Sequence, residues 1–213
     1  MKNHEFPHII IAIVILTIVA GFSFIIKAQW NNLASASAFS TIIIVLSILT
    51  KKLTAHFLDA NVEHELWQMQ NFGFRKKFQL KKPIPAGIIF PLILSLFSLG
   101  LIKFSAILTY ETRALKYRAS KRFGFYSFKE MTDWHQSIIG ASSTLAILIL
   151  AIVTYLLPYN LEYLSKLAIY YAFWNLLPIS KFDGTQIFFG SRILWSVLFT
   201  VTVIFLFFAL TIT

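Results

Sequence analysis

Long stretches of this sequence are apolar and carry no charged side chain over about twenty residues, the length that a helix needs to cross the hydrocarbon core of a bilayer. Five such runs cover residues 7–26, 28–50, 83–102, 136–161 and 193–213. A sixth run, 167–179, is too short for a standard span. Charged residues make up 13% of the chain, about half of their usual share in soluble proteins. We therefore expect an all-α polytopic membrane protein with about six transmembrane or re-entrant helices.

The chain is expected to form a single integral membrane domain over 1–213. The run 7–26 has a long apolar stretch and no small-x-small cleavage site before Lys27, so it is interpreted as an N-terminal anchor helix and not as a cleaved signal peptide. The run 193–213 is the C-terminal span. The segment 28–192 between them would hold the functional core.

The net charge of +10 has a simple explanation in a membrane protein. Basic residues that flank spans lie at phospholipid head groups, so the lipid bilayer is the expected partner and nucleic acid is not. The chain has no cysteine, which excludes thiol catalysis and thiolate metal sites. We expect a multi-pass protein of a prokaryotic cell membrane and not of an organelle.

The distribution of the basic residues is informative about topology. If all six apolar runs crossed the membrane, Lys and Arg would be shared almost equally between the two sides, and the positive-inside rule would give no orientation. This tie indicates that one run does not cross, and the proline-rich run 83–102 and the short run 167–179 are the candidates.

Two basic segments lie between the runs. Partial alternation over 62–74 predicts a strand or a small membrane-associated β-hairpin after the second span. The segment 103–135 combines basic and aromatic residues and is interpreted as an amphipathic interfacial segment, with a specific ligand site as the alternative.

The most specific motif follows the short run, where the sequence reads Asn-Leu-Leu-Pro-Ile-Ser-Lys-Phe-Asp-Gly from Asn175 to Gly184. It resembles the second signature of the site-2 protease family, the intramembrane zinc metalloproteases of peptidase family M50. This resemblance implies that Asp183 occupies the position of the third zinc ligand and that Asn175 occupies that of a residue binding the substrate carbonyl. Leu53-Thr54-Ala55, which leads to Val62–Trp67, resembles the segment that follows the family's first motif, and the small residues 140–144 stand where the family has an Ala-Gly-Pro-x-x-Asn element.

The first motif of that family, His-Glu-x-x-His, is missing. In its expected place the sequence has Ser47, Ile48 and Lys51, none of which is a zinc ligand or a general base there. The resemblance thus implies a degenerate member, a pseudoprotease without cofactor and without an assigned catalytic residue. An unpaired buried carboxylate is costly, so we expect the Lys51 ammonium to replace the metal and pair with Asp183, with Lys52 and Lys181 as competing partners.

The function expected from this resemblance is the binding of a transmembrane segment of a client protein, or service as a subunit of a membrane complex. The strand within 62–74 would pair with an unwound client segment. Two alternatives stay open. An active metalloprotease could use a variant zinc site with His64, Glu65 and Asp183, and an ion or solute transporter could bind its cargo at the broken helix near Asp183.

Overall fold

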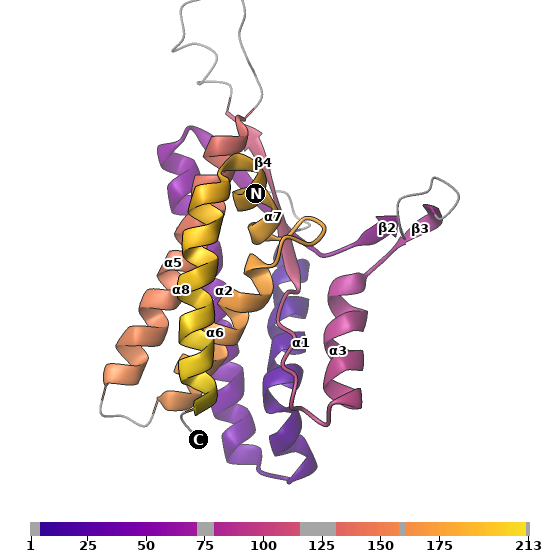
Figure 1. The fold of residues 1–213 in the computed structure, drawn as a ribbon. Coiled ribbons are helices and arrows are strands. Elements are labelled where there is room, and N and C mark those ends of the chain that lie inside the picture. The colour runs from indigo at the N-terminus through magenta and orange to yellow at the C-terminus, as the bar shows by residue number, and fades with distance from the viewer. Residues whose placement is uncertain (1–4, 72–78, 116–130, 158–160, 212–213) are drawn as a thin grey trace, which may run out of the picture.

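The computed structural model describes residues 5–71, 79–115, 131–157 and 161–211. These ranges hold seven helices and four short strands. Figure 1 shows the long helices side by side along one axis, with the N-terminus, β4 and α7 at one end and the C-terminus at the other. We call these the upper end and the lower end.

Four helices are long and apolar enough to cross a membrane. They are α1 (Glu5–Ile26), α2 (Trp30–Phe57), α5 (Asp133–Leu156) and α8 (Arg192–Thr211). Each matches one of the predicted runs, with shifted ends. The largest shift is in α2, which continues beyond the apolar run 28–50 and so carries Lys51 on the same helix as Ser47.

The prediction of a full span over 83–102 is wrong. The helix there, α3 (Ala86–Phe97), has 12 residues, too few to cross a bilayer core. Pro85 stands just before its first residue, and the helix ends before Leu99 and Gly100, which adopt left-handed φ angles of 51° and 82°. A left-handed residue ends a helix because the chain cannot continue its right-handed course.

The short run 167–179 is part of α6 (Glu162–Leu176), which has 15 residues and is followed by α7 (Asp183–Gly190), which has eight. Leu177 is extended, as expected of a residue that precedes a proline. Pro178 therefore separates α6 from α7 and creates the turn that holds the Asp-Gly pair.

The prediction of a strand within 62–74 is confirmed, but the strands do not form a local hairpin with each other. Strand β1 (Ala60–Leu66) pairs antiparallel with β4 (Leu108–Ala114), and His64 lies opposite Tyr110. The local pair is β2 (Met69–Asn71) with β3 (Gln79–Ile84). The segment 103–135 thus contributes a strand to a sheet where we expected an interfacial segment. The basic residues within 72–78 and 116–130 lie outside the described residues.

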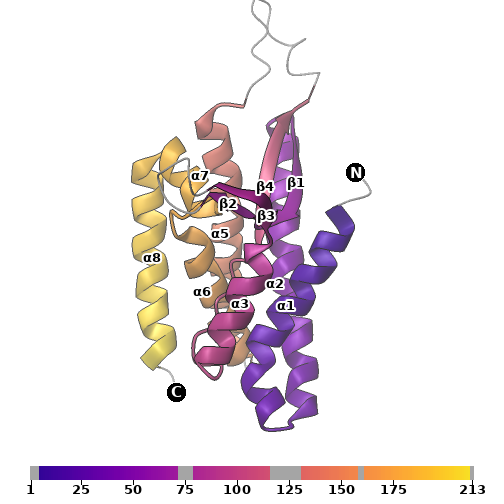
Figure 2. The same cartoon turned by 90° about the vertical axis from the view of Figure 1, so that its right-hand side faces the viewer.

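The path of the chain explains this pairing. In Figure 1, α3 runs towards the lower end, and the chain then returns upwards to β4. Figure 2 shows β1 and β4 side by side near the upper parts of α1 and α2, and both helices contact β1. The run 83–102 therefore forms an arm that runs down the bundle and returns, so β1 and β4, which precede and follow α3 in the chain, lie towards the same end.

The main hydrophobic core lies between α1, α2, α5 and α6. Large apolar side chains also cover the outer surface of the long helices, among them Ile149, Ile193, Ile204 and Phe207, each at least 59% exposed. An exposed apolar surface of this kind suits a lipid environment.

Candidate functional site

A buried ion pair joins α2 to the start of α7. Nζ of Lys51 lies 2.7 Å from Oδ2 of Asp183 and 2.9 Å from Oδ1. Only 2% of Lys51 and 1% of Asp183 is exposed. The other two candidate partners of Asp183 are engaged elsewhere, since Lys52 pairs with Glu5 and Lys181 pairs with Glu111.

The place of Asp183 follows from how α6 and α7 meet. It is the first residue of α7, where the free N–H groups of the first helical turn favour a carboxylate. A Cβ atom on Gly184 would lie 1.9 Å from the main-chain oxygen of Leu176. Only glycine permits this close approach, so the Asp-Gly pair of the motif holds Asp183 against the end of α6.

The aromatic ring of Tyr110 on β4 lies beside the ion pair. Nζ of Lys51 is 4.7 Å from the ring centroid, a cation–π geometry. The tyrosine hydroxyl donates a 3.0 Å hydrogen bond to the main-chain oxygen of Gln136 on α5. A Cβ atom on Gly140 would lie 2.9 Å from this hydroxyl. The small residues of 140–144 therefore let α5 pack against the ion-pair region.

The residues around Asp183 do not fit a catalytic zinc ion. Such an ion usually takes three protein ligands and a water molecule. Here the Asp183 carboxylate is bound by the Lys51 ammonium, and Ile48 packs in the hydrophobic core. In the part of the chain that the structure describes, no group of three His, Cys, Asp or Glu side chains could hold a metal ion.

Ser47 and Asn175 take part in a small buried polar cluster. Oγ of Ser47 lies 2.8 Å from Oγ of Ser143 on α5, and the Tyr171 hydroxyl donates to Ser47 at 3.4 Å. Nδ2 of Asn175 donates a 2.9 Å hydrogen bond to the main-chain oxygen of Tyr171 on its own helix. The amide nitrogen of Asn175, the residue expected to bind substrate, is thus used within α6.

His64 and Glu65, two residues of the variant zinc site, are neighbours on β1 and therefore point to opposite faces of the strand. His64 is buried and Glu65 is exposed. Oε1 of Glu5 lies 3.0 Å from Nδ1 of His64 and also accepts the His64 main-chain N–H at 3.3 Å. Lys52 lies 2.8 Å from the same carboxylate. The structure thus brings His64 to Glu5 and does not assemble His64, Glu65 and Asp183 into one site.

The environment of His64 favours its neutral form. Burial lowers the pKa of His64 below its ordinary value of 6.5, and the charges of Lys51 and Lys52 act in the same direction. The hydrogen bond to Glu5 opposes them. Burial dominates because the imidazolium would lose most of its hydration there.

Each outer edge of the β1–β4 sheet is capped by one side chain at its centre. On the β1 edge, Glu5 of α1 accepts the His64 N–H. On the β4 edge, Nε2 of Gln186 of α7 donates a 3.1 Å hydrogen bond to the main-chain oxygen of Tyr110. His64 and Tyr110 are partners in register, so both turn their main-chain groups outward, as residues of a non-hydrogen-bonded antiparallel pair do.

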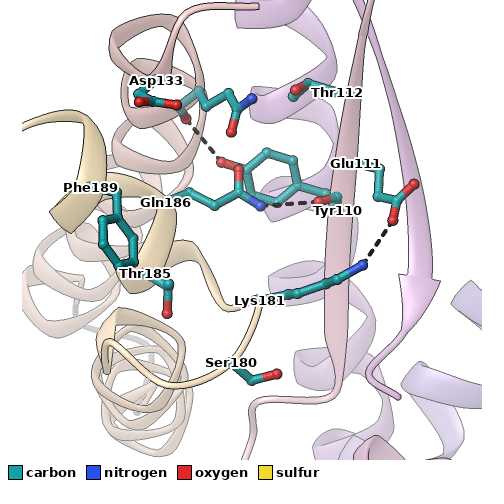
Figure 3. A pocket seen from close by; sticks show the side chains of 10 residues that line it. Tyr110, Glu111, Thr112, Asp133, Ser180, Lys181, Thr185, Gln186 and Phe189 are labelled. Atoms are coloured by element: carbon teal, nitrogen blue, oxygen red, sulfur yellow. Dashed lines mark hydrogen bonds and ion pairs between the residues drawn. The ribbon is translucent and has the colours of Figure 1, made fainter. Parts of the chain in front are cut away.

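A cavity of about 610 Å³ borders the β4 edge. Figure 3 shows it between β4, the start of α5 and α7, with the ion pair of Lys181 and Glu111 on one side and the Gln186 hydrogen bond inside it. The Oγ1 atom of Thr185, which lines the cavity, is buried without a hydrogen-bond partner. Its volume is within the range typical of ligand pockets.

No protein-family model, curated protein or solved structure matches this chain. The resemblance to site-2 proteases therefore rests on the sequence motifs alone.

Sequence reasoning missed three residues of this region: Glu5, Tyr110 and Gln186. Glu5 carried a weak signal, since an acid directly before the first apolar run is costly at membrane depth without a partner. Gln186 follows Asp183 by about one helical turn. Nothing in the sequence around Tyr110 indicates that its ring covers a lysine.

Proposed function

We propose that this chain is a multi-pass membrane protein of the site-2 protease type that has lost its zinc and binds transmembrane segments of client proteins without cutting them. The observation that supports this most is the contact of Lys51 with Asp183. The carboxylate that the resemblance assigns to zinc is bound by an ammonium from the helix that would carry the other zinc ligands. Four helices long enough to cross a membrane support the multi-pass location.

The client segment would dock as an extended strand on the edge of β4. Docking on 62–74 is less suitable, because β1 contacts α1 and its edge is capped by Glu5, which is also held by Lys52 and His64. The β4 edge instead borders the cavity, whose wall includes Tyr110, Glu111 and Thr112. Main-chain hydrogen bonds to an open edge give affinity with little sequence preference, which suits a protein that handles varied clients.

Without a client, Gln186 would occupy a hydrogen-bonding position on the β4 edge that a client strand would otherwise use. Its side-chain amide donates to the Tyr110 carbonyl as the N–H of an added strand would. A client strand would displace this side chain from the Tyr110 carbonyl. It would also form hydrogen bonds with the main-chain N–H and C=O of Thr112, which face the same edge because Thr112 lies two residues after Tyr110.

Metal analysis tests the loss of zinc. We expect the purified full-length protein to contain far less than one zinc ion per chain, and Asp183→Ala to leave that content unchanged. Stoichiometric zinc that is lost in Asp183→Ala would overturn the proposal and favour an active metalloprotease.

Client binding is tested with a labelled single-span peptide that carries a Gly-Pro break, added to the protein in detergent. We expect binding without cleavage. Thr112→Pro removes an edge N–H and should weaken binding roughly tenfold, while the matched control Thr112→Val should bind normally, since proline is tolerated on an open strand edge. Cleavage of the peptide, or no binding at all, would contradict the proposal, and ion uptake into vesicles would favour a transporter.

A further inference from the structure

The cavity beside the β4 edge has further walls, which are formed by the start of α5 and by α7. Figure 3 shows Asp133 on α5 and Thr185, Gln186 and Phe189 on α7 around it. A Cβ atom on Gly190, the last residue of α7, would lie 2.3 Å from the main-chain oxygen of Asp133. Only glycine permits this contact, so the end of α7 is held against the start of α5, which places Asp133 and Phe189 on one cavity.

The lining of the cavity carries an excess of negative charge. Its charged side chains are Glu111, Asp133 and Lys181, and Lys181 is paired with Glu111 at 3.0 Å. Among residues 5–71, 79–115, 131–157 and 161–211, no Lys or Arg side chain lies within ion-pair distance of the Asp133 carboxylate. An unpaired carboxylate at the rim of a cavity attracts a cation.

Two other features of the cavity suit a basic side chain. The Phe189 ring is 74% exposed and is therefore open to a cation–π contact with an ammonium or a guanidinium. Oγ1 of Thr185 is buried without a hydrogen-bond partner among the described residues, and a hydroxyl oxygen accepts a hydrogen bond from an N–H donor. Arginine fits this combination best, because its guanidinium has several N–H donors and a planar face that stacks on aromatic rings.

We propose that the cavity binds a basic residue, arginine above all, of the client segment that docks on the β4 edge. The inference rests on the proposed function and adds the class of client, a transmembrane segment with Arg or Lys beside the stretch that becomes extended. Such residues commonly flank membrane spans. Figure 1 places β4 and α7 at one end of the bundle, and the ends of membrane-crossing helices lie at the level of the head groups. The basic side chain would enter the cavity beside Asp133 and Phe189.

Three versions of the labelled single-span peptide test the charge. They carry arginine, its neutral isostere citrulline or glutamate at successive positions beside the Gly-Pro break, and their dissociation constants from the full-length protein are measured in detergent. At the position that reaches the cavity, we expect arginine to bind roughly fivefold more tightly than citrulline, as one partly exposed ion pair predicts. Glutamate should bind most weakly. The preference for arginine should shrink as salt is added, because salt screens such a pair.

Variants of the cavity assign the preference to Asp133. Asp133→Asn should bring the dissociation constants of the arginine and citrulline peptides together, and Asp133→Lys should reverse the preference towards glutamate. Glu162→Gln is the matched control and should keep the wild-type preference. Glu162, like Asp133, is an exposed acid at the first position of a helix, but it lies at the lower end of the bundle.

The outcomes separate this site from strand docking. If all three peptides bind equally at every position, or if Asp133→Asn keeps the preference for arginine, the basic-residue site is overturned while docking on β4 stands. If no peptide binds, docking on β4 is overturned as well.

Discussion

The ammonium of Lys51 and the carboxylate of Asp183, 132 residues apart in the chain, meet at 2.9 Å or less in the interior of the protein. The contact joins α2 to α7 and is covered by the Tyr110 ring. Two charges so deeply buried gain little net stability from each other, because each has lost its hydration, but each depends on the other for compensation.

Breaking this pair is expected to destabilise the protein strongly. Asp183→Leu or Lys51→Met alone leaves one buried charge without a partner, which should lower the free energy of unfolding by about 3–5 kcal/mol. The double variant replaces both charges by apolar groups and should recover most of that loss. Thermal unfolding in detergent measures all three.

An exposed ion pair provides the control. Lys181 and Glu111 are also joined at 3.0 Å, but both are exposed, so Lys181→Gln should cost less than about 1 kcal/mol. If the double variant were no more stable than the single variants, the two side chains would not act as a pair.

Gly184→Ala is expected to disturb the junction of α6 and α7. The new methyl group would meet the main-chain oxygen of Leu176 at 1.9 Å, and because that neighbour is backbone it cannot turn aside. The expected loss is about 3 kcal/mol or more, measured by thermal unfolding. Gly21→Ala is the matched control, since its methyl group would meet only the flexible end of the Leu33 side chain and alanine favours the helix. Similar losses in both variants would contradict the close approach at Gly184.

Acidification is expected to destabilise the fold through His64. Its pKa in the folded protein is lowered from 6.5 by burial, so above that pH the histidine is neutral whether the chain is folded or not. Below it, the unfolded chain takes up a proton that the folded protein disfavours, and stability falls by at most about 1.4 kcal/mol per pH unit. Unfolding measured between about pH 7.5 and pH 5.5 should show this loss in the wild type.

The comparison variant for this effect is His64→Gln, which removes the titrating group. Its stability should decline less on acidification than that of the wild type, so the difference between the two proteins should narrow as the pH falls. Parallel pH profiles would show that His64 is not the responsible group.

Much of the architecture is predictable from local sequence. Runs of uncharged apolar residues identify the four long helices, because nothing but a helix satisfies the backbone over that length in lipid. The partnership of Lys51 and Asp183 is expected from the positions that the two residues occupy in the family motifs. It requires that α2 stay helical beyond Thr50, as it does. Its interpretation as a replaced zinc site is still a proposal.

What could not be predicted depends on distant contacts. Leu99 adopts a left-handed conformation that is uncommon for a non-glycine residue, and Gly100 is a local stop signal that does not show that α3 ends as early as Phe97. The partner of β1 is β4, beyond the whole of α3, so alternation within 62–74 predicts a strand but cannot identify its neighbour. The capping of the sheet edges by Glu5 and Gln186 is likewise decided by helix packing.

The short helix α3 also predicts how the protein would be oriented in a membrane. Because α3 is too short to cross a bilayer core, only Lys27, Lys103 and Lys166 lie in or beside connections at the lower end, leaving 16 of the 19 basic residues in other parts of the sequence. The numbers of Lys and Arg on the two sides of the membrane, which are nearly equal if every run crosses, are therefore very unequal in this arrangement. By the positive-inside rule the upper end, with the N-terminus and the Lys51–Asp183 pair, should face the cytoplasm.

Single cysteines test this orientation, because the 213 residues of this sequence include no cysteine. Asn31 is an exposed residue near the start of α2 at the lower end, and Asn61 is exposed at the start of β1, which follows the upper end of α2. In intact cells a membrane-impermeant maleimide should label Asn31→Cys at once and Asn61→Cys only after the membrane is permeabilised. The reverse pattern would place the ion pair at the outer side, and labelling of both from outside would contradict the membrane crossing of α2 itself.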